Sequence, residues 1–484
     1  MVQKIKNHLI GDILWITLSF LLVLTKAISN SITGDELSTL SIITDLNYSE
    51  IISHKYTFDF NPPLYFVVTK FFYNLIPTNL GFRFVSVVSF LLNQLILSSM
   101  IKRKKNLFSL IIYFNPLMIY FGSYSRSYML SILFVIAIYH YSRNLYSQSR
   151  FRIHYFIILS SLISVGFWIN YLIGIYTAFL FLLTLLTERI KKIFISRLII
   201  LLGLCIPILI FESQFILNYT STLSDIKQDQ STFGFLYQFL YICYGLIFGE
   251  TFAPAHELVL ILPTLLLISG IYLFRVPGWK LSKKSLKLIL LSFLTISLTS
   301  LSNFGRPMYV FYLLPFIPIV LENINSSVDK RKFIPLSATL GLIYSISNFN
   351  YMTSNSIYYF SPVSTIEYDE IFKSWEDDNT LLIVSPSYNI HNYKRFHNSN
   401  TKNTIFIDHF DESRKELIIN ELKMKLTEFD KATFIHEKPN QFIEDIHNVI
   451  TKEYYLSAKE CKEHKSIISG LQYCYISFNN YEKK

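Results

Sequence analysis

The stretch "SITGDELSTL", residues 31–40, follows the first long apolar run of the chain and places two adjacent carboxylates, Asp35 and Glu36, where that run ends. A helix start accounts for part of this pattern, because Thr33 stands three residues before Glu36 and this is the spacing of a capping box. Apolar residues then recur at helical spacing, as expected for an interfacial helix. The capping box explains Glu36 better than it explains Asp35. Both acids are candidate catalytic residues, with Asp35 the stronger.

The composition divides the chain into two parts. Of its 484 residues, 51% are hydrophobic and only 16% are charged, whereas an ordinary soluble domain carries roughly 25% charged residues. Residues 350–484 contain 16 basic and 20 acidic residues, which leaves 28 basic and 14 acidic residues in 1–349. This division predicts a transmembrane domain over 1–349 and a small soluble domain over 350–484.

Basic clusters between the apolar runs predict the topology of the first part. Lys and Arg collect in cytoplasmic loops, so the number of crossings between two neighbouring clusters must be even. In two places three apolar runs lie between neighbouring clusters, so only two of the three can cross the membrane. The middle runs, 61–76 and 233–249, are therefore expected to be interfacial or re-entrant on the outer side. The N-terminal segment resembles a secretory signal but fits better as an uncleaved anchor. The clusters lie at 4–6, 102–105, 143–152, 188–192, 280–287 and 329–332.

This parity predicts a polytopic α-helical membrane protein of about eleven spans, with interfacial helices in its outer loops and its C-terminal domain outside the cytoplasm. Most of the acids in 1–349 then fall in or beside two outer loops. The basic excess belongs to cytoplasmic loops rather than to a nucleic-acid surface, since the clusters are separated by apolar runs.

The C-terminal part alternates strand and helix patterns. Strands are expected at 380–387, 403–410 and 433–437 and an amphipathic helix at 412–429, which predicts a small α/β domain. It contains no glycine-rich phosphate loop, and its histidines do not fall at metal-ligand spacing. Cys461 and Cys474 allow either a disulfide or two free thiols.

The outer loops carry two further candidate regions. The stretch "FNPPLYFV", residues 60–67, contains Asn61, Pro62, Pro63 and Tyr65. The diproline stiffens the chain and removes two backbone donors. These residues are a candidate substrate loop, and the alternative is an ordinary start of a helix.

Three arginines, Arg83, Arg126 and Arg306, stand at outer ends of apolar runs, against the cytoplasmic bias of basic residues. They could snorkel to lipid head groups. A guanidinium also has the fork geometry that binds phosphate, so these arginines, with Tyr128 and Tyr309 beside them, are candidate phosphate-binding residues. Together with the outer acids they suggest an anionic ligand and a proton acceptor in one cavity.

The order of these motifs resembles a known family. An acidic pair after the first span, then "PPLY", then an "RSYML" segment and a Tyr- and Pro-rich span look like the membrane glycosyltransferases of the GT-C class, such as protein mannosyltransferases and lipid A aminoarabinose transferases. The resemblance covers about residues 8–320. It implies a polyprenyl-phosphate sugar donor, Asp35 as general base, and Arg126 and Tyr128 in the donor site. It assigns no metal ligand and leaves a divalent cation open.

The expected function is therefore transfer of a sugar from a polyprenyl-phosphate carrier to a lipid, glycan or protein acceptor on the outer side of a bacterial cytoplasmic membrane. Its partners would be that donor, membrane lipids and the acceptor, with no nucleic acid. A transporter or flippase of lipid-linked sugars is the alternative. It predicts charges deep within the spans or paired repeats with broken helices, and the sequence shows neither.

Overall fold

The structure of the protein is a computed structural model. It describes residues 2–29, 32, 35–56, 61–100, 111, 113–147, 153–171, 173–174, 176–177, 232–248, 261, 263–265, 267–268, 283–301, 310–318, 334–352, 379–385, 403–407, 415–436, 441–465 and 472–484.

The chain forms two compact units. The first, a helical unit, comprises Met1–Ser29, Ile42–Gly249 and Leu262–Phe349. The second, a C-terminal unit, comprises Asn30–Ser41, Glu250–Ile261 and Asn350–Lys484. Two segments of the expected outer loops therefore group with the C-terminal part.

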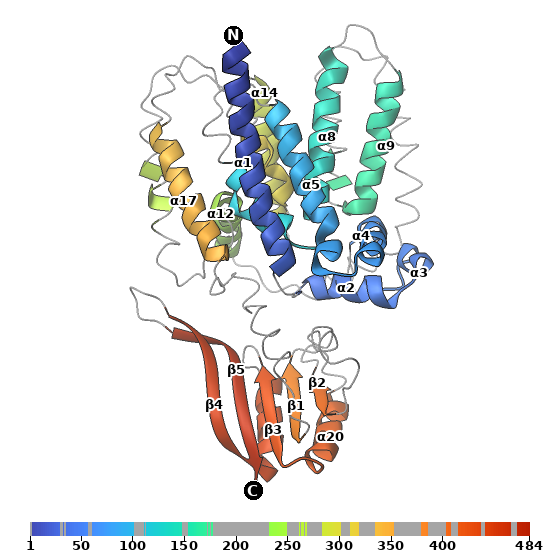
Figure 1. The fold of residues 1–484 in the computed structure, drawn as a ribbon, viewed down its shortest axis with the longest axis vertical. Helices are drawn as coiled ribbons and strands as arrows, with labels where there is room; N and C mark the ends of the chain where they lie inside the picture. The colour runs from blue at the N-terminus through green and yellow to red at the C-terminus, as the bar shows by residue number, and fades with distance from the viewer. Residues whose placement is uncertain are drawn as a thin grey trace. The chain divides into compact units, whose positions relative to one another are not determined.

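The described part of the helical unit consists of helices of unequal length. Helices α1, α5, α8 and α9 lie side by side, and the short α3 and α4 lie at one end of them (Figure 1). Helix α7 packs against α1, α5 and α12, and η1 packs against α8. The bounds are α1 Val2–Ser29, α2 Asp35–Asp45, α3 Tyr48–Ile52, α4 Pro63–Leu75, α5 Asn79–Met100, α7 Pro116–Gly122, α8 Tyr128–Ser147, α9 Ile153–Ile169, α12 Thr232–Phe248, α14 Lys283–Leu301, η1 Phe311–Leu313 and α17 Ile334–Met352.

Helix α5 fits a membrane span by its length. Its 22 residues extend about 33 Å at 1.5 Å per residue, which matches a hydrocarbon core of about 30 Å. Within the described ranges it is the one helix that is long and apolar enough to cross a membrane. Several other described helices contain shorter apolar segments of 10–17 residues. The count of eleven spans stays a prediction.

Buried polar side chains join the helices of this unit. Ser19 Oγ on α1 donates a hydrogen bond of 3.0 Å to Gln94 Oε1 on α5. Asn93 Nδ2, also on α5, donates one of 2.9 Å to the carbonyl oxygen of Met129 on α8. Hydrogen bonds of this kind, with small residues at the contacts, hold helices together where no water competes.

The segment 61–76, expected not to cross, forms helix α4. Its 13 residues extend only about 20 Å, which is shorter than a hydrocarbon core. Pro63 occupies the first helical turn, where its missing N–H costs nothing. Helix α4 packs against α3, α5 and α9. The second such segment, 233–249, corresponds to α12, and a location in the interface stays a prediction for both.

The C-terminal unit contains a mixed five-stranded sheet in the order β2-β1-β3-β5-β4 (Figure 1). Strand β1 pairs in parallel with β2 and β3, while β5 pairs antiparallel with β3 and β4. The three expected strands correspond to β1, β2 and β3 and the expected helix to α20. The bounds are β1 Thr380–Ser385, β2 Thr404–Phe406, α20 Lys415–Leu426, β3 Lys431–His436, α21 Gln441–Glu453, β4 Tyr454–Lys465 and β5 Gln472–Lys483.

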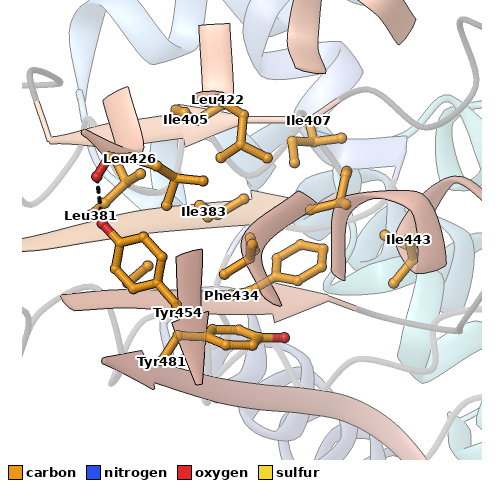
Figure 2. Packing of buried hydrophobic residues seen from close by; sticks show 13 residues of the cluster. Leu381, Ile383, Ile405, Ile407, Leu422, Leu426, Phe434, Ile443, Tyr454 and Tyr481 are labelled. Atoms are coloured by element: carbon orange, nitrogen blue, oxygen red, sulfur yellow. Dashed lines mark hydrogen bonds between the residues drawn. The ribbon is translucent and has the colours of Figure 1, made fainter. Parts of the chain in front are cut away.

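Apolar side chains from the sheet and from α20 and α21 form one core. All six residues of β1 are buried, as expected for a strand covered on both faces. Figure 2 shows Ile383 and Leu422 in this cluster together with Phe434 and Tyr454. The Tyr454 hydroxyl donates to the carbonyl oxygen of Leu426, so the polar end of this buried ring is satisfied.

The register of the terminal hairpin bears on the two cysteines. Cys461 on β4 lies opposite Ser477 on β5, while Cys474 on β5 lies opposite Glu463 on β4. An offset of two to three residues, at roughly 3.3 Å per residue, puts the two Cα atoms beyond the roughly 7 Å that a disulfide spans. A disulfide between them would require the backbone of the hairpin to move.

Candidate active site

Three hydroxyl groups join three separate elements at one point of the helical unit. The Tyr65 hydroxyl on α4 lies 3.3 Å from Ser86 Oγ on α5 and 3.2 Å from Ser125 Oγ in the turn between α7 and α8. Ser125 Oγ donates to the carbonyl oxygen of Phe82 at 2.8 Å, and Ser86 Oγ donates to the carbonyl oxygen of Arg126 at 3.2 Å. These two hydrogen bonds attach the turn to α5 through the Ser125 side chain and through the Arg126 carbonyl group.

Arg126 occupies this fastened turn immediately before helix α8. Its backbone N–H donates to the carbonyl oxygen of Tyr124 at 2.9 Å, and its side chain is only 9% exposed. Arg126 lies two residues before the first residue of α8, and both a helix N-terminus and a guanidinium favour an anion. A role of Arg126 in binding phosphate stays a prediction.

Arg83 has a different environment on α5. It is 1% exposed, and its Nη1 donates a hydrogen bond of 3.0 Å to the carbonyl oxygen of Ala27 in the last turn of α1. A cation at a helix C-terminus is stabilised by the unsatisfied carbonyl groups there. This guanidinium N–H group therefore joins α5 to the end of α1.

The acidic pair lies at the beginning of α2. Helix α2 starts at Asp35, whose side chain is outside the described residues, and Glu36 is 1% exposed. Thr33 is also outside them, so the expected capping box with Glu36 stays a prediction. A charged side chain as buried as Glu36 is rare unless it has a specific partner.

A capping box is present instead at the next helix, α3. Asn47 Oδ1 accepts from the backbone N–H of Glu50 at 3.0 Å, and Glu50 Oε2 accepts from the backbone N–H of Asn47 at 3.0 Å. Lys55 Nζ lies 3.1 Å from Glu50 Oε1. The hydrogen bond from Asn47, together with Lys55, lowers the pKa of the Glu50 carboxyl. Glu50 therefore has a structural role, which leaves fewer acids of the predicted outer loop for chemistry.

The residues of the predicted substrate loop are not equivalent. Pro62 and Pro63 are buried at the start of α4 and so act in starting that helix. The Asn61 carbonyl oxygen accepts a hydrogen bond of 2.9 Å from the Tyr56 hydroxyl. Tyr65 is 1% exposed and belongs to the hydroxyl cluster described above.

Aromatic rings surround the beginning of α8. Tyr128 lies 4.3 Å from Phe121 between ring centroids, and Phe121 lies 4.6 Å from Phe311 of η1. The structure thereby brings residue 311 close to the Arg126 turn. Arg306 and Tyr309, the remaining predicted phosphate-binding residues, lie outside the described residues.

Ser86 and Ser125 are site residues that the sequence analysis did not single out. Ser86 is a polar residue within the apolar run 82–101, and a polar side chain in such a run usually faces other helices. Ser125 is adjacent to Arg126 but reads as an ordinary loop serine. Neither the polar residue in the apolar run nor the position beside Arg126 predicts that both serines contact Tyr65.

A second polar cluster lies in the C-terminal unit, formed by His436 on β3, His447 on α21, and Asn479 and Tyr481 on β5. His447 Nδ1 is hydrogen-bonded to the Tyr481 hydroxyl. Burial, assisted by the positive charge of protonated His436 and of Lys459, lowers the pKa of His447 to about 4. Among the described residues, no group of three or more His, Cys, Asp or Glu side chains is arranged to hold a metal ion.

Comparison with known proteins shows the fold class. No family model matches the chain, and no curated protein matches its sequence. Its fold is nevertheless similar to that of a solved GT-C enzyme, as the sequence motifs predicted. The chain is similar to ArnT from Cupriavidus metallidurans in the apo state, with a TM-score of 0.55 and 10% identity over 96% of this chain and 97% of that one. It is also similar to the same enzyme bound to undecaprenyl phosphate, with a TM-score of 0.54 and 10% identity over 97% of both chains.

Proposed function

We propose that this protein is a membrane glycosyltransferase that transfers a sugar from a polyprenyl-phosphate carrier to a lipid, glycan or protein acceptor on the non-cytoplasmic side of the membrane. The observation that carries this proposal is the likeness of fold over nearly the whole of both chains to an enzyme whose structure contains undecaprenyl phosphate. The apolar helix α5 and the motif order of residues 8–320 support the same location and class.

The donor phosphate would bind at the Arg126 turn. When the anomeric C–O bond breaks, negative charge develops on the phosphate that leaves. Arg126 would stabilise this charge from a site that is already fastened by Ser86 and Ser125, and such preorganised electrostatic stabilisation is often the largest catalytic contribution. Arg306 and Arg83 would contribute to the same site.

Asp35 would remove the proton from the acceptor hydroxyl as it attacks the anomeric carbon, a contribution of about 10²–10⁴-fold. A single displacement of this kind inverts the anomeric centre. A double displacement would need two carboxylates flanking the sugar, whereas Asp35 and Glu36 are neighbours on α2 and diverge by about 100°. Glu36 would support the helix or orient the acceptor. A divalent cation at the donor phosphate is compatible with this chemistry but is not required by it.

The test compares cells that lack the protein after complementation with wild type, Asp35→Asn or Asp45→Asn. Asp45 is a matched control because it is an exposed acid on the same helix. Surface glycans, lipid-linked sugars and exported proteins are then analysed by mass spectrometry. We expect wild type and Asp45→Asn to restore one missing sugar, and Asp35→Asn at equal abundance to leave it missing.

Full restoration by Asp35→Asn would contradict the proposed mechanism. The flippase alternative predicts a different result. In that case isolated membranes of the deletion strain still transfer the sugar, while the donor stays on the cytoplasmic side of the membrane. Such a result would show that the protein is a flippase and that the proposed function is wrong.

A further inference from the structure

Three polar side-chain groups of the C-terminal unit converge on one point. His436 Nε2 lies 3.3 Å from His447 Nε2, and the Asn479 amide nitrogen lies 3.0 Å from the first and 3.4 Å from the second. The three side chains come from β3, α21 and β5. His436 is 4% exposed and Asn479 is 1% exposed, so two of the three groups are withdrawn from water.

Three hydrogen bonds cannot occupy all three sides of this triangle at the same time. Each ring nitrogen carries either one hydrogen or one lone pair. If the Asn479 amide donates to both rings, two lone pairs face each other without a hydrogen between them. If one ring donates to the other, the single lone pair of the acceptor ring is shared with the amide donor. Each assignment therefore leaves one side of the triangle without a hydrogen bond, although each of the three groups still has a partner.

The dimensions of the triangle fit a tetrahedral metal centre. Metal–nitrogen distances of about 2.0–2.1 Å place two ligand atoms of a tetrahedron about 3.3–3.4 Å apart. The ring orientation agrees as well. Tetrahedral ligation predicts about 5.2 Å between the ring centroids, and a linear N–H···N hydrogen bond predicts about 5.6 Å. The observed centroid distance is 5.3 Å, with the rings at 86° to each other.

Tyr481 supplies the support that a ligating histidine normally has. Its hydroxyl is hydrogen-bonded to His447 Nδ1, so His447 can donate from Nδ1 and present the lone pair of Nε2 to a metal. Metal-bound histidines almost always donate their other ring N–H in this way, which orients the ring. Tyr481 is itself held in the core of the C-terminal unit (Figure 2).

We propose that His436, His447 and Asn479 form a binding site for a divalent transition metal in the C-terminal unit. The chemistry of these ligands favours Zn²⁺. Imidazole nitrogen suits Zn²⁺ and disfavours Mg²⁺ and Ca²⁺, which prefer oxygen. The Asn479 amide presents its oxygen to the metal after a half-turn, since the two ends of an amide have nearly the same shape. Water takes the fourth position. The bound metal would join β3, α21 and β5, and this role is independent of the proposed glycosyl transfer.

The experiment uses the full chain, purified in detergent without a polyhistidine tag and stripped with a chelator. Titration with Co²⁺ and with Zn²⁺ is followed by visible absorption and by calorimetry. We expect wild type to bind one Zn²⁺ more than the double variant His436→Ala/His447→Ala, and the Co²⁺ form to show the intense visible bands of a tetrahedral centre. Zn²⁺ should raise the melting temperature of wild type but not of the double variant.

Three further variants test the assignment. Asn479→Asp should bind Zn²⁺ about tenfold more tightly, because a carboxylate replaces an amide, and Tyr481→Phe should bind it about 10–100-fold more weakly. His140→Ala on α8, outside the cluster, is the control and should bind like wild type. The proposal is overturned if wild type takes up no more metal than the double variant, or if the Co²⁺ form lacks tetrahedral bands. The wild-type spectrum decides even if a variant fails to fold.

Discussion

The Tyr65 hydroxyl lies 3.2 Å from Ser125 Oγ, although 60 positions separate the two residues in the chain. This contact joins the start of α4 to the turn that carries Arg126. Since Ser86 on α5 lies 3.3 Å from the same hydroxyl, this one side chain contacts polar groups of three elements.

Replacing Tyr65 by Phe should therefore disturb the Arg126 turn without opening a cavity. Both serine hydroxyls donate to carbonyl oxygens, so the Tyr65 hydroxyl donates to one serine at a time, and its loss removes one hydrogen bond at a cost of about 1 kcal/mol. We expect a lower melting temperature in detergent and roughly tenfold lower glycosyl transfer. The matched control is Tyr73→Phe on the same helix, whose ring packs edge-on against Phe82. Equal behaviour of the two variants would show that the hydroxyl cluster does not position the turn.

Arg126 should be sensitive to its shape as well as to its charge. Arg126→Ala removes the charge that would stabilise the leaving phosphate, so transfer should fall by about 10²–10³-fold. Arg126→Lys keeps the charge but loses the fork of donors and should lie between this variant and wild type. Transfer from a synthetic polyprenyl-phosphate sugar measures both. Arg152→Lys, in an expected cytoplasmic cluster, should leave the rate unchanged. Wild-type rates for Arg126→Ala would remove this residue from the donor site.

Asn115 should be important for the stability of the helical unit. Its side-chain oxygen accepts from the backbone N–H groups of Leu117 and Met118 at the start of α7. Its Nδ2 donates to the carbonyl oxygen of Leu246 on α12 at 3.0 Å and lies 3.3 Å from the Tyr344 hydroxyl on α17. Asn115→Ala should lower the free energy of unfolding by about 2–4 kcal/mol, because it removes a cap and leaves buried groups unpaired.

Asn115→Ser separates these two contributions. Serine can still cap α7 but cannot reach both α12 and α17, so its melting temperature in detergent should lie between those of wild type and Asn115→Ala. Identical melting of Asn115→Ser and wild type would show that the contacts with Leu246 and Tyr344 do not stabilise the protein.

Two glycines should respond to alanine with opposite signs. A Cβ at Gly122 on α7 would stand 3.0 Å from Phe90 Cδ2 and 3.1 Å from Val23 Cγ1, where α5 and α1 approach. Overpacking of this kind costs about 1–3 kcal/mol. At Gly166 on α9 the nearest atoms are 3.9 Å away, so alanine should gain about 0.5–1 kcal/mol from helix propensity. Thermal unfolding of the two variants checks both signs, and a stabilised Gly122→Ala would contradict the tight packing.

Local patterns predicted much of the C-terminal unit. The apolar run at 380–387 predicted the strand β1, and the spacing in 412–429 predicted the helix α20. Strands β4 and β5 were not predicted, because Tyr454–Lys465 and Gln472–Lys483 are rich in polar and charged residues. Pairing of β5 with β3 places these residues in the sheet, and such long-range pairing overrides a weak local preference.

The sequence by itself determined the chemical types that the proposed site requires: an acid pair after the first apolar run, a diproline that starts a helix, and arginines at the ends of apolar runs. These follow from local composition and spacing. Only the tertiary structure decided that Tyr65 meets Ser86 and Ser125, that Arg83 binds the end of α1, and that His436, His447 and Asn479 converge. Each of these depends on contacts between elements far apart in the chain, and no local pattern of residues specifies which distant side chain will satisfy a buried polar group.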